Sequence, residues 1–135
     1  MTAEFSPPPT DTPSTPTILV VEDEPSIRNI IKLALEMKGY RLLTAADGDE
    51  GIQLAEEHPG PIDLVVTDML LPGIHGSDLV RTLLKSRPGL HVIYISGYVG
   101  AEQELPAGET GRMHFLAKPF TPRQLLEAVT AVFAK

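Results

Sequence analysis

The side chains best suited to chemistry are three carboxylates, a hydroxyl and an ammonium group, each at the end of a short apolar segment. They are Glu22, Asp23, Asp68, Ser96 and Lys118. Carboxylates without cysteine or clustered histidine suit Mg²⁺, which proteins hold through one or two carboxylates, waters and phosphate oxygens. An ionised aspartate held in this way can attack phosphorus and form an acyl phosphate, while a lysine offsets the charge of the transferring group. The set therefore predicts phosphoryl transfer to Asp68, with Ser96 donating a hydrogen bond to the product.

Each of these residues also has a simpler interpretation. Asp68 could be a turn or cap residue, and the acids Glu22-Asp23-Glu24 could be those favoured at a helix N-terminus. Ser96 could be a turn hydroxyl, and Lys118 could be a solvated surface lysine. A shared site is favoured because the simpler interpretations would all have to hold together, at the ends of four separate apolar segments.

Five short apolar segments are predicted strands, and helical patterns separate them. The strands are Thr17–Val21, Arg41–Ala45, Leu64–Asp68, His91–Ser96 and Met113–Ala117. Such alternation predicts an α/β fold in which helices cover both faces of a parallel sheet, and we expect the doubly wound order 2-1-3-4-5. Because parallel strands end at the same edge of a sheet, the four polar strand ends are expected to form one site.

Capping signals mark several helix starts between these strands. Asp47 and Glu50 have capping-box spacing, as do Thr121 and Gln124, and Ser77 is a candidate cap for the helix after the third strand. Apolar residues at helical spacing define the expected buried faces. In the first helix these are Ile27, Ile30, Ile31, Ala34 and Leu35.

Composition limits the classes of protein that the chain could represent. Its 135 residues suffice for one domain with a core. The net charge of -7, with scattered basic residues, argues against a nucleic-acid surface. The absence of cysteine excludes disulfides and thiolate metal sites. No apolar run is long enough to span a membrane and no signal-peptide core is present, so a cytoplasmic protein without membrane insertion is expected.

Two segments lack the regular pattern of the rest. Residues 1–16 are rich in Pro and Thr, and we interpret them as a disordered tail or linker. The segment from Gly97 to Gly111 contains enough Gly and Pro to allow one poor helix at most. The folded domain is therefore assigned to residues 17–135.

Several motifs in this order resemble the receiver domain of two-component response regulators, over roughly Thr17 to the C-terminus. They are the Glu22-Asp23 pair after a hydrophobic strand, Asp68 followed by Pro72-Gly73, Ser96-Gly97, and Phe115-Leu116-Ala117-Lys118-Pro119-Phe120. The resemblance implies a flavodoxin-like fold and Mg²⁺-dependent phosphorylation of Asp68. The donor would be a phosphohistidine of a sensor histidine kinase or a histidine phosphotransfer protein. The run after Ser96 also resembles receivers attached to hybrid sensor kinases.

The same resemblance implies a metal site. Asp23 and Asp68 would bind Mg²⁺ directly, together with the backbone carbonyl of Leu70. Glu22 would act through a metal-bound water, although aspartate is commoner at its position and is one methylene shorter.

The resemblance further implies a switch and a phosphoryl-binding group. Ser96 and Phe115 would form the switch pair, Ser96 standing where threonine is commoner, and Lys118 would bind the phosphoryl group, with a cis peptide bond to the proline that follows it. A downstream protein would bind the face formed by the fourth helix, fifth strand and fifth helix. Leu70 and Tyr98 would border the path of the water that removes the phosphoryl group. Leu70 offers no hydrogen bond to orient this water and bulky Tyr98 can shield the path, which predicts slow decay, unless the Tyr98 hydroxyl instead holds a water.

Two other functions compete with a phosphoacceptor domain that is not a true enzyme. One is an aspartyl-phosphate phosphohydrolase of the haloacid-dehalogenase type, which usually carries a second Asp two residues after its nucleophile on the first strand. Here Asp23 is followed at that distance by Pro25. The other is a pseudo-receiver that only binds proteins, and the presence of Asp68, Asp23 and Lys118 argues against it.

Overall fold

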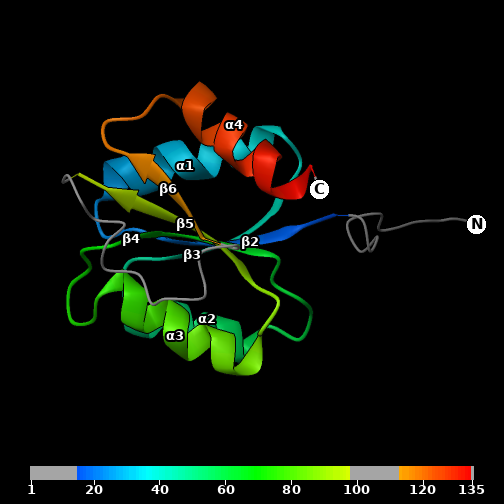
Figure 1. The fold of residues 1–135 in the computed structure, drawn as a ribbon, viewed down its shortest axis with the longest axis vertical. Coiled ribbons are helices and arrows are strands. Elements are labelled where there is room, and N and C mark those ends of the chain that lie inside the picture. Colours follow the sequence, from blue (N-terminus) through cyan, green and yellow to red (C-terminus); the bar gives the residue numbers. More distant parts are fainter. Residues whose placement is uncertain (1–14, 98–112, 135) are drawn as a thin grey trace, which may run out of the picture.

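A five-stranded parallel sheet forms the centre of the computed structural model, which describes residues 15–97 and 113–134 (Figure 1). Its strands are β2 (Thr17–Val21), β3 (Arg41–Ala45), β4 (Leu64–Asp68), β5 (His91–Ser96) and β6 (Met113–Ala117). All five have the predicted bounds. The sheet order is β3-β2-β4-β5-β6, which is the doubly wound, flavodoxin-like order 2-1-3-4-5 in chain order.

Four helices of the described residues cover the two faces of this sheet. They are α1 (Pro25–Met37), α2 (Gly48–Glu57), α3 (Gly76–Ser86) and α4 (Pro122–Phe133). Figure 1 shows α1 and α4 on one face and α2 and α3 on the other. The poor helix expected between Gly97 and Gly111 falls mostly outside the described residues, as does most of the proposed N-terminal tail. Among the described residues, every helix is too short or too polar to cross a membrane.

The core consists of two clusters of apolar side chains, one on each face of the sheet. All five residues of β4 are buried, and alternate side chains point to opposite faces, as they must in a strand. Val65 therefore packs in the cluster beneath α2 and α3, whereas Val66 packs in the cluster beneath α1 and α4. Burying each such side chain stabilises the fold by roughly 1.5–3 kcal/mol, so Asp68 stands at the end of a firmly packed strand.

The predicted capping signals hold at two helices and fail at a third. Thr121 and Gln124 form a reciprocal capping box at α4. Asp47 caps α2 by accepting from the Glu50 N–H at 2.8 Å. The prediction for Ser77 was wrong, because α3 already begins at the preceding residue and uses His75 as an N-cap without a side-chain hydrogen bond.

One predicted core residue of α1 was also wrong. Ile31, Ala34 and Leu35 are buried against the sheet, but Ile30 is 45% exposed. Successive helical residues are turned by about 100°, so Ile30 lies on the flank of α1 rather than on its buried face. Leu33, which is 51% exposed, is the next residue along this flank.

Candidate functional site

The carboxyl ends of β2, β4, β5 and β6 meet at one edge of the sheet. The strand register aligns them, with Asp68 opposite Ile95 and Ser96 opposite Ala117. Lys118, directly after β6, extends its ammonium group back across this edge. Its Nζ donates to Asp68 Oδ2 at 2.6 Å and forms an ion pair with Glu22 Oε1 at 3.7 Å.

The three acidic residues at this edge form one cluster. Glu22, Asp23 and Asp68 each place a carboxylate oxygen within 4.8 Å of the others. Glu22 is fully buried, Asp68 is nearly so, and Asp23 is exposed. Three carboxylates this close repel one another unless a cation or a proton intervenes.

Glu22 gives the clearest sign that the cluster suits a cation. Its Oε2 accepts the Glu24 N–H at 3.1 Å, but its buried Oε1 has no hydrogen-bond partner. The 3.7 Å ion pair of this oxygen with Lys118 is too long to be a hydrogen bond, and leaving a buried carboxylate oxygen without one is costly. The oxygen-only donor set therefore fits a hard divalent cation such as Mg²⁺.

Burial raises the pKa of the Glu22 carboxyl from 4.5 to about 7. The Glu24 N–H and the Lys118 ammonium oppose this rise, while the charges of Asp68 and Asp23 add to it. Burial lowers the pKa of Lys118, but its hydrogen bond to Asp68 and the nearby carboxylates outweigh that effect and raise the pKa above 10.5. Lys118 is therefore a permanent positive charge at neutral pH, whereas Glu22 is balanced between two protonation states.

Main-chain hydrogen bonds hold the turns that present these groups. The Glu22 N–H donates to Ala45 O at 3.1 Å, and Arg28 Nη1 donates to Glu22 O at 2.7 Å. Lys118 N donates to Ser96 O at 2.8 Å, and the peptide bond from Lys118 to Pro119 is cis, as expected. Arg28 had no sequence signal for this contact, because it reaches back over the whole turn between β2 and α1.

Main-chain N–H groups of the loop after Asp68 donate hydrogen bonds to the Asp68 carboxylate and to β5. Leu70 N donates to Asp68 Oδ1 at 3.0 Å, and Met69 N donates to Ile95 O at 3.0 Å. Gly73 has φ +85°, a conformation that favours glycine, and turns the loop toward α3. The Leu70 side chain is 54% exposed at this edge, and Tyr98, named with it as a border of the water path, lies outside the described residues.

The residues proposed as a switch pair lie on neighbouring strands. Ser96 is buried at the end of β5, and Phe115 is half-buried on β6. The Phe115 ring stacks on buried Tyr94, with ring centroids 5.6 Å apart. Tyr94 was missed at first, although strand alternation places it on the same face as Ser96 and the register pairs it with Phe115.

A mostly apolar pocket of about 510 Å³ lies beside the Lys118 stem. Its other lining residues are Ile27 and Ile30 of α1, Gly97 after β5, and Pro119 and Phe120 after β6. The exposure of Ile30 is thus explained by its position at this pocket. The pocket gives the acidic site an apolar border on the α1 side.

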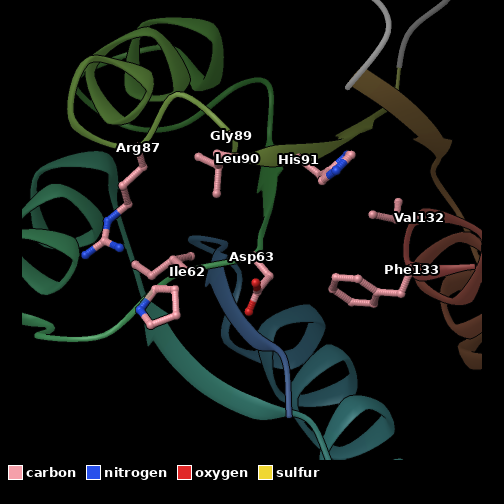
Figure 2. Close-up of a pocket in the computed structure, with 9 residues that line it drawn as sticks. Ile62, Asp63, Arg87, Gly89, Leu90, His91, Val132 and Phe133 are labelled. Atoms are coloured by element: carbon pink, nitrogen blue, oxygen red, sulfur yellow. The ribbon is translucent and has the colours of Figure 1, made fainter. Parts of the chain in front are cut away.

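A second pocket, of about 540 Å³, lies at the opposite edge, where the strands begin (Figure 2). Figure 2 shows Arg87 and His91 on opposite sides of it, with Phe133 below His91. The Arg87 guanidinium donates to three carbonyl oxygens at 2.9–3.2 Å, and Asp63 accepts the N–H of Thr17 at 2.8 Å. Two of the charged groups around this pocket are thus engaged in holding the main chain.

Comparisons with known proteins agree with this geometry. A family model described as the response regulator receiver domain matches residues 18–130. The sensor kinase CckA of Brucella abortus (strain 2308) is 37% identical over 128 residues, and response regulator GtcR of Aneurinibacillus migulanus is 34% identical over 119 residues. These matches cover 93% and 88% of this chain but only 13% and 47% of the two relatives.

Solved structures are similar over most of the domain. A receiver domain protein from Clostridium thermocellum has a TM-score of 0.77 and 34% identity, over 88% of this chain and 94% of that chain. The receiver domain of the hybrid histidine kinase CckA has a TM-score of 0.67 and 38% identity, over 86% of this chain and 97% of that chain.

Proposed function

Because the chain belongs to the response regulator receiver domain family of two-component systems, we propose that it is a phosphoacceptor switch whose acceptor is Asp68. The observation that carries the proposal is the Lys118–Asp68 hydrogen bond of 2.6 Å within the acidic cluster. Receiver domains are signalling domains rather than true enzymes, and the only chemistry proposed is the gain and loss of one phosphoryl group. The Lys118–Asp68 pair also speaks against a domain that merely binds proteins.

The donor is a phosphohistidine of a sensor kinase or a phosphotransfer protein. A carboxylate oxygen of Asp68 attacks phosphorus, the P–N bond of the donor breaks, and its electron pair stays on the histidine nitrogen. Lys118 remains protonated throughout, because its pKa is raised. Its ammonium group contacts the Asp68 carboxylate before the reaction and would contact the phosphoryl oxygens afterwards.

The acidic cluster would hold Mg²⁺ for this reaction. Asp23, Asp68 and the Leu70 carbonyl are proposed as direct ligands, with Glu22 acting through a water. When bound, the ion neutralises charge on the transferring phosphoryl group. The Oε1 of Glu22, which accepts no hydrogen bond, and the approach of the three carboxylates to within 4.8 Å of one another support this assignment.

The apolar pocket beside Lys118 supports a docking surface for the donor protein. A phosphohistidine must reach Asp68 from solvent, and Ile27, Ile30 and Phe120 border that approach. Burying such apolar surface would stabilise the encounter, while Lys118 would face the phosphoryl group. We therefore place the donor on the α1 side of the site.

The output is a change of surface on the other side of the site. Ser96 is proposed to donate a hydrogen bond to the phosphoryl group, which frees space for the Phe115 ring. The downstream partner is then expected on the face of β6 and α4, the fifth strand and fifth helix of the sequence prediction, together with the residues after Ser96. The cytoplasm stays the predicted location.

Labelling with a small acyl phosphate tests the proposal. Wild type should gain the mass of one phosphoryl group in the presence of Mg²⁺ and none after chelation. Asp68→Asn should abolish the gain, because an amide of nearly equal shape is not nucleophilic. Asp49→Asn, at an exposed residue in the first turn of α2, is the matched control. Equal labelling of Asp68→Asn and Asp49→Asn would refute the assignment.

A further inference from the structure

The first residue of α2, Gly48, lies directly against Ile74 of the loop that follows Asp68. A Cβ added to Gly48 would overlap Cγ1 of Ile74 and lie 2.6 Å from its Cδ1. The φ of Gly48 lies outside the left-handed region, so its backbone conformation does not require glycine. The absence of a side chain at Gly48 leaves space that the outer atoms of the Ile74 side chain occupy, so a larger residue here would have to displace them.

Ile74 belongs to the segment that carries the Leu70 carbonyl. At one end this segment is fixed to β5 through Met69, and it closes on itself where Gly76 N donates to Met69 O at 2.9 Å. Ile74 N donates locally, to Pro72 O at 3.1 Å. Its side chain is half-buried and packs against the core cluster beneath α2 and α3, which leaves side-chain packing to hold this part of the loop.

We propose that Ile74 is a positioning residue for the metal site, and that its contact with Gly48 anchors the loop that carries Leu70, whose carbonyl is a proposed ligand. This inference rests on the proposed function, because Leu70 matters to the metal only if its carbonyl is a ligand. A methyl group on Gly48 would lift Ile74 and shift the loop. Truncation of Ile74 would remove the anchor and leave the loop free to move.

The alternative is that Gly48 and Ile74 are ordinary core residues, whose substitution lowers stability and nothing else. The two explanations differ in Mg²⁺ affinity, measured by calorimetry on the unphosphorylated protein. We expect Gly48→Ala and Ile74→Ala each to weaken Mg²⁺ binding about tenfold, the lower end of what outer residues of metal sites contribute. Ala is otherwise the better helix former at position 48, so a loss there would come from the contact.

The double variant Gly48→Ala/Ile74→Ala makes the test specific to this pair. The methyl group added at position 48 enters the space that the truncated Ile74 vacates. Gly48→Ala should therefore cost much less Mg²⁺ affinity in the Ile74→Ala background than in wild type, since only residues in contact couple in this way. If Ile74→Ala fails to fold, Ile74→Val removes Cδ1 alone and permits the same comparison.

Ile52→Ala is the control, because Ile52 lies on α2 and packs against the same core cluster. It should lower the thermal midpoint without weakening Mg²⁺ binding. The inference is overturned if the Ile74 variants bind Mg²⁺ as Ile52→Ala does, or if the two single effects simply add. Absence of Mg²⁺-dependent labelling in wild type would instead refute the proposed function itself.

Discussion

The ammonium group of Lys118 lies 2.6 Å from Asp68 Oδ2 and bridges three strand ends, since Glu22 Oε1 is 3.7 Å from the same nitrogen. The Lys118 ammonium thus lies where it can stabilise the negative charge of the Asp68 carboxylate and, after transfer, that of a phosphoryl group. Its side chain keeps a quarter of its surface exposed, so the contact is open to a ligand.

The first prediction concerns this lysine. Lys118→Ala should slow labelling by a small acyl phosphate about 100-fold at saturating Mg²⁺, the cost typical of removing one group that stabilises developing charge. The measurement is the initial rate of mass gain. Lys85→Ala, at an exposed lysine in the last turn of α3, serves as control. A rate equal to that of the control would remove Lys118 from the reaction.

The second prediction uses the raised pKa of Glu22. Its folded-state pKa of about 7 lies above the ordinary 4.5, so the folded state holds the proton more tightly than the unfolded state. This contribution to stability is complete below about pH 4.5 and is lost as the pH rises through about 7. A shift of this size corresponds to about 3 kcal/mol in the metal-free protein.

Urea unfolding at about pH 5 and about pH 8 measures this effect. Glu22→Gln should flatten the difference between the two pH values, whereas Glu56→Gln, at an exposed residue of α2, should preserve it. Because the ionised Glu22 carboxyl attracts a nearby cation more strongly than the protonated one does, added Mg²⁺ should stabilise wild type more at the higher pH. Equal Mg²⁺ effects at both pH values would contradict the role given to Glu22.

The third prediction separates the fold from the site. Arg87 donates to the carbonyls of Ala55, His58 and Gly60, and a lysine cannot reproduce this forked geometry. Arg87→Lys should lower the free energy of unfolding by about 2 kcal/mol. Arg81→Lys, in an exposed ion pair with Asp78, should change it by less than about 0.5 kcal/mol. Labelling of Asp68 in folded Arg87→Lys should match wild type.

The fourth prediction concerns the switch. A phosphoryl mimic bound at Asp68 should shift the NMR signals of Phe115 and Tyr94, whose rings are stacked, as well as those of the Asp68 loop. Ser96→Ala should confine the shifts to that loop, because the variant lacks the hydroxyl that is proposed to donate a hydrogen bond to the phosphoryl group. Ser86→Ala, on α3, should leave them as in wild type. Shifts that reach Phe115 without the Ser96 hydroxyl would contradict this mechanism.

The fifth prediction concerns how long the phosphoryl group lasts. Leu70 is exposed at the site and offers no hydrogen bond to orient an attacking water, so decay should be slow. Leu70→Asn/Tyr98→Glu should dephosphorylate faster than wild type, as followed by loss of the phosphoryl mass. Leu33→Asn, at an exposed leucine of α1, should not. An unchanged decay rate in the double variant would disprove the shielding argument.

The central strands β2, β4 and β5 were predictable because strands buried on both faces appear as continuous apolar runs. The position of the polar groups at one edge follows from the same topology, since parallel strands end together. Asp68 and Lys118 are 50 residues apart, yet their positions at two strand ends were sufficient to predict that they share an edge.

What the sequence could not supply depends on distances between packed elements. Ser77 looked like a cap, but α3 already begins at Gly76, which packs so closely on the Asp68 carbonyl that an added Cβ would overlap its oxygen. The helical spacing of apolar residues predicted Ile30 to be buried, yet it is exposed at a pocket. The spacing gives the direction of the buried face of a helix but not its width. The contact between Gly48 and Ile74 likewise joins two segments whose proximity is not encoded in either one.

The assembly of the site from separate strand ends also sets when it can first exist during synthesis. A chain that has emerged as far as β5 holds the entire acidic cluster and Ser96, but it lacks Lys118, which follows the last strand. Since β6 pairs with β5 at the edge of the sheet, Lys118 reaches the acidic cluster only when this strand has docked. The lysine on which fast phosphoryl transfer is proposed to depend therefore arrives with the final strand, and a chain that stops before it would accept a phosphoryl group only slowly.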